Sequence, residues 1–158
     1  MKLLFILIPL FLFMSCDSGT TPTNNHDLSV SFTLADTLGN QTTIFHTGSS
    51  FDMAFSVKNL TGKPLTYGFT GTPVVFQILS ADSVFAGSTD FLTFTQDYKR
   101  GTLDNQATYT DRWRAPNTIG RQKPLVLLPG QYKARILHNF FNEFRMEDPQ
   151  LIPFTIIQ

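Results

Sequence analysis

The stretch FDMAFSVKNLTGKPLTYGF, residues 51–69, decides the fold of this chain. In its first half, apolar side chains stand at every second position, with polar or small ones between them. Because successive side chains of a β-strand point to opposite faces, this alternation predicts a strand with one buried and one wet face. Turn-forming residues interrupt the pattern at residues 59–64, and alternation then resumes. The stretch therefore predicts two antiparallel strands joined by a loop of about five residues, half-buried against a second sheet.

The rest of the chain repeats short runs of the same kind. Gly, Pro, Asn and Ser stand between the runs rather than inside them, and no window has the spacing of an amphipathic helix. About eight or nine short strands with turn signals roughly every 8–12 residues predict an all-β fold, a single antiparallel β-sandwich. Besides the two in residues 51–69, short runs from which these strands would come lie at residues 28–34, 42–46, 74–79, 84–85, 91–95, 106–114, 125–128, 131–137 and 152–157. We expect long connections at residues 98–105, 115–123 and 138–149.

The start of the chain has the pattern of an export signal. Lys2 is followed by an apolar run, then by Ser15 and Cys16, the only cysteine. A basic start, a short hydrophobic segment and a small residue before the cut are typical of a secretory signal, and the segment is too short for a lasting membrane span. A small residue followed by cysteine resembles a bacterial lipobox, in which the thiol becomes lipidated. A plain signal peptide with an incidental cysteine is the alternative.

These features predict the domain organisation and the location. We expect a lipoprotein signal peptide at residues 1–15, the lipidated Cys16 and a polar tether at residues 16–27, and one domain at residues 28–158. The protein is then anchored on the extracytoplasmic side of a bacterial cell envelope, in a leaflet that the sequence leaves open. With the only thiol lipidated, no cysteine remains for a disulfide, and the fold must depend on a hydrophobic core.

Charge and motifs exclude several functions. Without Lys2, eleven basic side chains oppose twelve acidic ones, so nothing suggests a nucleic-acid partner. His26, His46 and His138 stand far apart, whereas a metal site needs several convergent ligands, commonly in short-spaced pairs. The sequence has no Gly-x-Ser-x-Gly elbow, no Ser-x-x-Lys pair and no glycine-rich phosphate loop. We therefore expect no enzyme, no metal and no cofactor.

Three short pieces of the sequence, taken in their order along the chain, resemble one protein family. The first runs from Val57 to Phe69 and continues as Val-Val-Phe-Gln-Ile at residues 74–78. The second is Phe-Thr-Gln at residues 94–96, and the third joins Trp113 to the Leu-Pro-Gly-Gln-Tyr that ends at Tyr132. Together they resemble the intracellular proteinase inhibitor (BsuPI) domain family, which has a Phe-x-Gln and a Trp followed by an L-x-P-G-x-Y segment.

The resemblance implies an immunoglobulin-like form of the β-sandwich and, at the level of the family name, proteinase inhibition. It carries over no inhibitory residue, and the family is intracellular, whereas this chain begins with an export signal. Two functions therefore stay open. One is a lipid-anchored envelope binding protein that inhibits a proteinase through a surface loop. The other is a non-inhibitory, immunoglobulin-like interaction module that docks another envelope protein or a glycan.

The candidate protease-contact loop is the connection at residues 98–105. It carries Tyr98, Lys99 and Arg100 together, and aromatic and Arg side chains often supply most of the binding energy of an interface. Lys-Arg also suits a trypsin-like cleft with an acidic specificity pocket. An ordinary solvated loop is the alternative.

Two further expectations concern Trp113 and the basic residues. Trp113, the only tryptophan, stands in an alternating run and should pack in the core or at its edge. Residues 99–135 carry eight basic side chains against two acidic ones. These charges form either one positive face toward an acidic partner or a membrane surface, or scattered strand-edge charges that block aggregation.

Overall fold

The described part of the chain consists of strands and their connections. The computed structural model describes residues 23–25, 27–90, 92, 97–117, 125–138 and 151–158. These residues form eleven strands and no helix, so none of them belongs to a helix long and apolar enough to cross a membrane. The predicted all-β fold is confirmed. The strands are β1 (Thr23–Asn25), β2 (Leu28–Ala35), β3 (Ile44–His46), β4 (Phe51–Asn59), β5 (Leu65–Thr70), β6 (Val74–Ser80), β7 (Ser83–Gly87), β8 (Tyr98–Leu103), β9 (Thr108–Ala115), β10 (Gly130–His138) and β11 (Leu151–Ile157).

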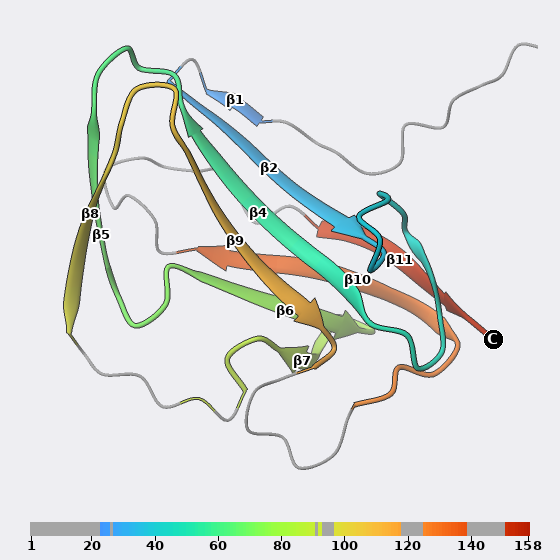
Figure 1. The fold of residues 1–158 in the computed structure, drawn as a ribbon. Coiled ribbons are helices and arrows are strands. Elements are labelled where there is room, and N and C mark those ends of the chain that lie inside the picture. Colours follow the sequence, from blue (N-terminus) through green and yellow to red (C-terminus); the bar gives the residue numbers. More distant parts are fainter. Residues whose placement is uncertain (1–22, 26, 91, 93–96, 118–124, 139–150) are drawn as a thin grey trace, which may run out of the picture.

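Two larger sheets and a two-stranded ribbon make up the fold (Figure 1). The first sheet has the order β1-β2-β4-β9, the second has the order β3-β11-β10-β6-β7, and β5 pairs with β8 alone. Neighbouring strands are antiparallel except β3 and β11, which are parallel. The β5–β8 ribbon stands at one side of the two sheets (Figure 1).

Phenylalanine rings from both sheets fill the space between them. Phe51 of β4 stacks on Phe45 of β3 with ring centroids 4.2 Å apart, and lies 5.2 Å from the ring of Phe154 in β11. The ring centroids of Phe32 in β2 and Phe76 in β6 lie 6.4 Å apart. Each of the five rings is at most 4% exposed, and burying such a ring contributes about 1.5–3 kcal/mol. The two larger sheets therefore pack face to face, as the predicted sandwich requires.

The predicted hairpin at residues 51–69 is wrong, although its first strand is correct. Every second residue of β4 is buried, as the alternation indicates. However, β4 lies between β2 and β9, whereas β5 pairs with β8. After Asn59 the chain leaves the first sheet, and its next strand, β5, belongs to the ribbon. The two strands within residues 51–69 therefore pair with different strands. Local alternation predicts strands but does not identify their partners.

Asn59 holds the corner at which the chain changes sheets. Its side chain is fully buried, and it is the one buried polar residue found in the described part of the chain. The amide Nδ2 donates to the carbonyl oxygens of Lys63, at 2.7 Å, and Leu103, at 2.9 Å. The Oδ1 atom accepts from the backbone N–H and the hydroxyl of Thr61, at 2.9 and 2.8 Å. One side chain thus joins the end of β4, the following loop and the end of β8.

Three other boundaries differ from the prediction. β1 lies within residues 16–27, which were expected to be a tether, because it pairs with β2. The connection expected at residues 98–105 contains β8. Residues 125–128, one of the short apolar runs, form no strand, although Leu127 is buried. The additional strands owe their form to a neighbouring strand, which a local pattern does not reveal, and they raise the number above the expected eight or nine.

Trp113 packs in the core, as predicted. Its side chain is 7% exposed and belongs to the same buried cluster as the phenylalanines. The indole Nε1–H donates to the carbonyl oxygen of Asn117 at 2.7 Å. A buried indole needs such a partner for its N–H. The bond ties the segment after β9 to the core.

Replacing Asn59 by Ala should destabilise the fold strongly. The change leaves the buried carbonyl oxygen of Leu103 without the amide donor and removes one of two donors to Lys63, whose other donor is the hydroxyl of Thr61. An unsatisfied buried group costs about 1–3 kcal/mol, and the bonds from Asn59 to Thr61 are lost as well. We therefore expect the free energy of unfolding, measured by urea denaturation, to fall by about 2–4 kcal/mol. Asn105→Ala, at an exposed turn position, is the matched control and should change it by less than about 0.5 kcal/mol. Equal effects of the two substitutions would contradict this role of Asn59.

Candidate functional site

The predicted contact residues Tyr98, Lys99 and Arg100 lie on strand β8, not on a loop. Tyr98 pairs with Thr70 of β5, and the ladder continues to the pair of Leu103 and Leu65. The polar composition that suggested a loop instead reflects a ribbon whose outer face meets solvent. The predicted loop is therefore wrong; the three named residues are exposed on the strand.

Two glycines let tyrosine rings lie flat across the ribbon. A side chain at Gly68 would collide with the ring of Tyr98, and one at Gly101 would collide with the ring of Tyr67. Each ring thus covers a glycine of the opposite strand, an arrangement that restores contacts which glycine alone lacks. The ring of Tyr98 is held by the backbone beneath it.

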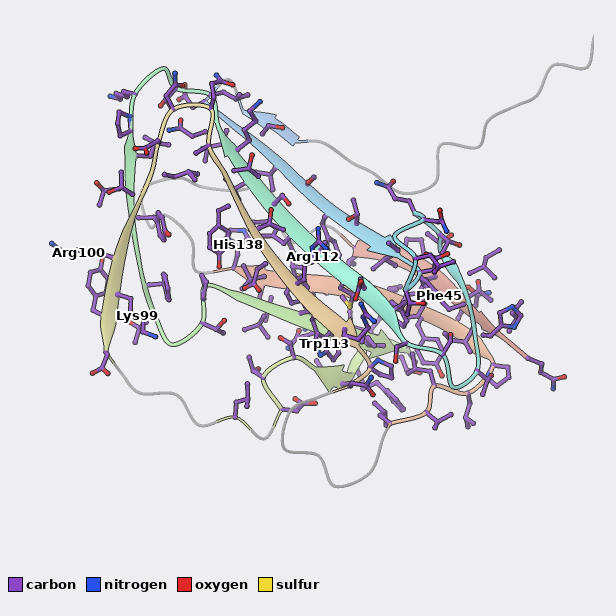
Figure 2. All side chains as sticks on the ribbon, viewed as in Figure 1. Phe45, Lys99, Arg100, Arg112, Trp113 and His138 are labelled. Carbon is purple, nitrogen blue, oxygen red and sulfur yellow. The ribbon has the colours of Figure 1, made fainter. Side chains whose placement is uncertain are left out.

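Alternation along β8 separates the three predicted residues into two faces. Tyr98 and Arg100 share the outer face, and the Arg100 guanidinium carbon lies 5.3 Å from the centroid of the Tyr98 ring. Lys99 belongs to the other face, and Figure 2 shows its side chain directed away from that of Arg100. Tyr98 is 56% exposed, which is a large exposure for an aromatic residue. The outer face, defined here by Tyr98 and Arg100, is the first candidate surface.

The base of the ribbon is anchored in the core. Leu65 and Leu103 are 7% and 6% exposed and belong to the buried cluster. The ring of Tyr67 meets that of Tyr109 in β9 edge-on, with centroids 6.1 Å apart. The ribbon is therefore fixed at one end and presents Tyr98 and Arg100 near the other.

The basic residues of this region that the structure describes do not lie on one sheet. Those within the described part of the chain lie on β8, β9 and β10, which belong to three different sheets. Arg114 forms an ion pair with Asp52, and Lys133 pairs with Asp82 at 2.6 Å. Arg135 donates to the side-chain oxygen of Gln77. This distribution fits strand-edge charges better than one positive surface.

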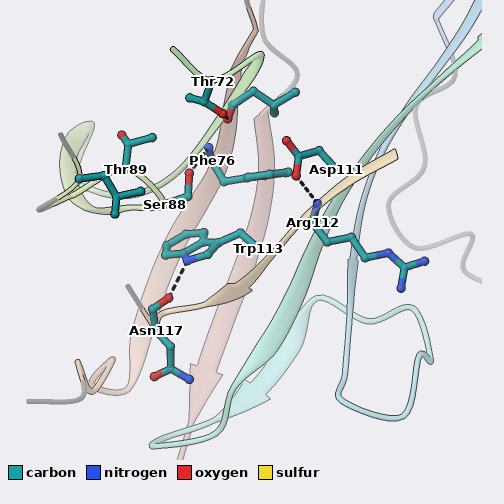
Figure 3. A pocket seen from close by; sticks show the side chains of 10 residues that line it. Thr72, Phe76, Ser88, Thr89, Asp111, Arg112, Trp113 and Asn117 are labelled. Carbon is teal, nitrogen blue, oxygen red and sulfur yellow. Dashed lines mark hydrogen bonds between the residues drawn. The ribbon is translucent and has the colours of Figure 1, made fainter. Parts of the chain in front are cut away.

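A small pocket opens between the edges of the two larger sheets (Figure 3). Its volume is about 180 Å³, and its wall on the first sheet is the strand β9. Its opposite wall comes from β6, from the residues just before it and from the segment after β7. It is lined by Thr72, Val74, Phe76, Ser88, Thr89, Leu92, Asp111, Arg112, Trp113 and Asn117.

Asp111 brings a carboxylate into this pocket from the inner face of β9. It lies in alternation with Tyr109 and Trp113, which also face inward, and one oxygen accepts the backbone N–H of Arg112 at 2.8 Å. The other oxygen is 3.5 Å from the hydroxyl of Tyr109, which is at the limit of a hydrogen bond. Burial raises the pKa of the Asp111 carboxyl above its ordinary value of 3.8.

The described histidines do not form a metal site. Among the described residues, no group of three or more His, Cys, Asp or Glu side chains is placed to bind one metal ion together. His46 donates from Nδ1 to the oxygen of Gln158 at 2.8 Å. His138 stacks on Phe55 with centroids 6.1 Å apart, and its buried Nδ1 has no hydrogen-bond partner. Burial lowers the pKa of His138 below its ordinary value of 6.5.

Some predicted residues lie outside the described part of the chain. These are Cys16, His26, the Phe-Thr-Gln at residues 94–96, the strand expected at residues 91–95 except for Leu92, and most of the connection expected at residues 138–149. Leu92 itself lies in no strand. Sequence reasoning missed the pocket completely, because its walls come from segments far apart in the chain. The one available signal was Asp111, a charge at an inward position of the alternating run that contains Trp113.

Stability should decrease as pH falls below about 6.5, in part because of His138. The folded chain resists protonating this half-buried ring, whereas the unfolded chain takes up the proton near pH 6.5. We expect the free energy of unfolding to fall between about pH 7 and pH 5, with a smaller slope in His138→Phe, which keeps the stacking on Phe55. Identical slopes for the parent and His138→Phe would refute this assignment.

The comparisons with known proteins identify no family. No protein-family model and no curated protein matches the chain. A β-glucosidase from Listeria innocua, solved in complex with glucose, is 11% identical with a TM-score of 0.43, and the match covers 82% of this chain and 16% of that one. The alkylpurine DNA glycosylase AlkC of Pseudomonas fluorescens, solved bound to DNA containing an abasic site analog, is 12% identical with a TM-score of 0.41, and the match covers 82% of this chain and 30% of that one. The chain thus spans less than a third of the length of either structure.

Proposed function

We propose that the chain is a non-enzymatic binding protein of the bacterial cell envelope, anchored by a lipid on Cys16. In this proposal, the outer face of the β5–β8 ribbon contacts another envelope protein. The observation that carries the proposal is the pair of Tyr98 and Arg100 on that face. Tyr98 is more than half exposed, its ring lies over Gly68, and the Arg100 guanidinium stands against that ring.

The physical chemistry of this pair suits a contact surface. Tyrosine and arginine are among the residues that most often supply the binding energy of interfaces. A ring that is already held in place loses little conformational freedom on binding. Arg100 forms no ion pair within the described residues, so its donors can meet a carboxylate of the partner in a two-point hydrogen bond. The surface therefore fits a partner with an acidic group beside an apolar patch.

The lipid anchor gives the first prediction of this proposal. Replacing Cys16 by Ala should abolish both processing and membrane retention, because several acyl chains at about 0.8 kcal/mol per buried methylene give nearly permanent attachment. Fractionation of cells into soluble and membrane parts, with detection of the chain by mass, measures both effects. Ser18→Ala, which keeps both Ser15 and Cys16, serves as a control for changes near the cleavage point. Membrane fractionation of Cys16→Ala like that of the parent would exclude the anchor.

Proteinase inhibition is the second candidate, and the extended conformation of Lys99 and Arg100 favours it. Protease clefts take up substrates and inhibitors as extended strands, and the BsuPI-like pieces of the sequence point to the same function. Because Lys99 and Arg100 face opposite sides of the ribbon, only one of them can enter a specificity pocket. Inhibition should then depend on one basic side chain, whereas surface docking should depend on Tyr98 and Arg100 together.

Three variants separate the two candidates. The double variant Tyr98→Ala/Arg100→Ala should weaken binding to a partner isolated from envelope extract by about tenfold or more, since each change removes a residue type that commonly contributes over 1 kcal/mol. Lys99→Ala, on the opposite face of the same strand, is the matched control and should bind like the parent. Surface plasmon resonance with the purified partner gives the dissociation constants. Equal weakening by Lys99→Ala would contradict docking through the outer face.

The same variants test inhibition by titration against trypsin-like and subtilisin-like enzymes. Inhibition by the parent that is lost in Lys99→Ala, or in Arg100→Ala alone with Tyr98→Ala unaffected, would establish the inhibitor. Failure of the parent to inhibit any of these enzymes leaves the interaction module. Binding that is competed by soluble oligosaccharides would replace the protein partner by a glycan.

A further inference from the structure

The pocket between β9 and β6 is separate from the ribbon surface and has its own chemistry. We propose that it binds a small primary alkylammonium group, with the Asp111 carboxylate as the counter-ion and the rings of Trp113 and Phe76 as apolar walls. This inference does not depend on the proposed function, because none of the pocket's lining residues lies on β5 or β8.

The charge of the lining residues selects a cation. Among the described residues that line the pocket, Asp111 and Arg112 are the charged ones. Figure 3 shows the Arg112 guanidinium directed away from the pocket, whereas the Asp111 carboxylate lies on the side of Phe76. Half-burial of a carboxylate without a counter-ion is unfavourable, and a bound cation offsets that cost. A bound anion would increase the free-energy cost of the half-buried carboxylate.

The hydrogen bonds already made leave room for a donor at Asp111. One carboxylate oxygen accepts the N–H of Arg112, but the other has only the long contact to Tyr109. The indole N–H of Trp113 is used by Asn117, so this residue offers its ring rather than a donor. Aromatic rings attract organic cations through their electron-rich faces. A carboxylate oxygen with spare capacity beside two rings suits an ammonium head on a short apolar stem.

The lining excludes a metal ion as the preferred cation. Hard metal ions take six or more oxygen ligands in proteins, commonly from several carboxylates. The described lining has one carboxylate, and the described residues hold no group of three possible metal ligands. The hydroxyls of Thr72 and Ser88 are engaged with the carbonyl of Val74 and the N–H of Phe76. An organic cation needs fewer oxygen ligands and uses the rings as well.

The size of the pocket limits the ligand to a few carbon atoms. A volume of about 180 Å³ is below the roughly 300–1,000 Å³ of pockets for drug-sized ligands, and equals the space of about six waters. An aminoalkyl group such as ethanolamine fits, whereas a whole sugar chain does not. The ammonium can belong to a dissolved amine or to the headgroup of a membrane lipid.

The fluorescence of Trp113 can report binding in the pocket, because Trp113 is the only tryptophan in the chain and lines the pocket. The full chain in detergent is titrated with ethanolamine at constant ionic strength while indole fluorescence is recorded. We expect a saturable change with a dissociation constant on the order of 1 mM, typical of so small a ligand. Ethylene glycol, which replaces the ammonium by a hydroxyl, should give no saturable change.

Asp111→Asn should weaken ethanolamine binding at least tenfold, because it removes the charge while keeping the shape. Asp104→Asn, at an exposed turn, is the matched control and should bind like the parent. If Asp111→Asn fails to fold, the comparison of ethanolamine with ethylene glycol on the parent chain decides alone. Equal responses to the two ligands, no saturation up to about 100 mM, or unchanged affinity in a folded Asp111→Asn would overturn the proposal.

Vesicles identify the source of the ammonium group. A fluorescence change with ethanolamine-headgroup lipid vesicles, but not with choline-headgroup vesicles of the same net charge, assigns the pocket to a lipid headgroup. Saturation by dissolved ethanolamine without a response to either vesicle assigns it to a free amine. A response to both vesicle types that persists in Asp111→Asn reports membrane contact by another part of the chain and counts against headgroup binding in the pocket.

Discussion

The buried amide of Asn59 is the interaction on which the arrangement of the sheets depends. The chain must leave the first sheet after β4 and start the ribbon, and a turn buried at that point would leave backbone groups without partners. Asn59 supplies two donors and one acceptor in the required places, joining Lys63, Leu103 and Thr61. The position of Tyr98 and Arg100 relative to the sandwich follows from that corner, since β8 ends at Leu103.

Sequence reasoning recovered the elements whose burial is periodic and missed those that depend on a distant partner. β2 and β4 alternate strictly and were predicted almost to their ends. β8 has the burial pattern of an exposed strand with only its last residue buried, so its sequence resembles a loop. Its strand form comes from pairing with β5 and from the tyrosine rings that cover Gly68 and Gly101. No local pattern contains that information.

The candidate sites also divide into features that local sequence indicates and features that depend on residues far apart in the chain. Tyr98, Lys99 and Arg100 were selected by residue type, and the structure adds which of them can act together, because strand alternation puts Lys99 on the opposite face. The pocket could not be predicted, since Asp111 and Phe76 come from different sheets and meet only after the sandwich closes. A charge at an inward position of an edge strand is nevertheless readable from sequence once the alternation is known.

The contact between Tyr98 and Gly68 has a consequence for how related sequences can diverge. Any side chain at Gly68 would occupy the place of the Tyr98 ring, so the two positions cannot change independently. A substitution at Gly68 would displace the ring while most of the ladder between β5 and β8 stays intact. In relatives of this chain, loss of the glycine should therefore accompany loss of the tyrosine.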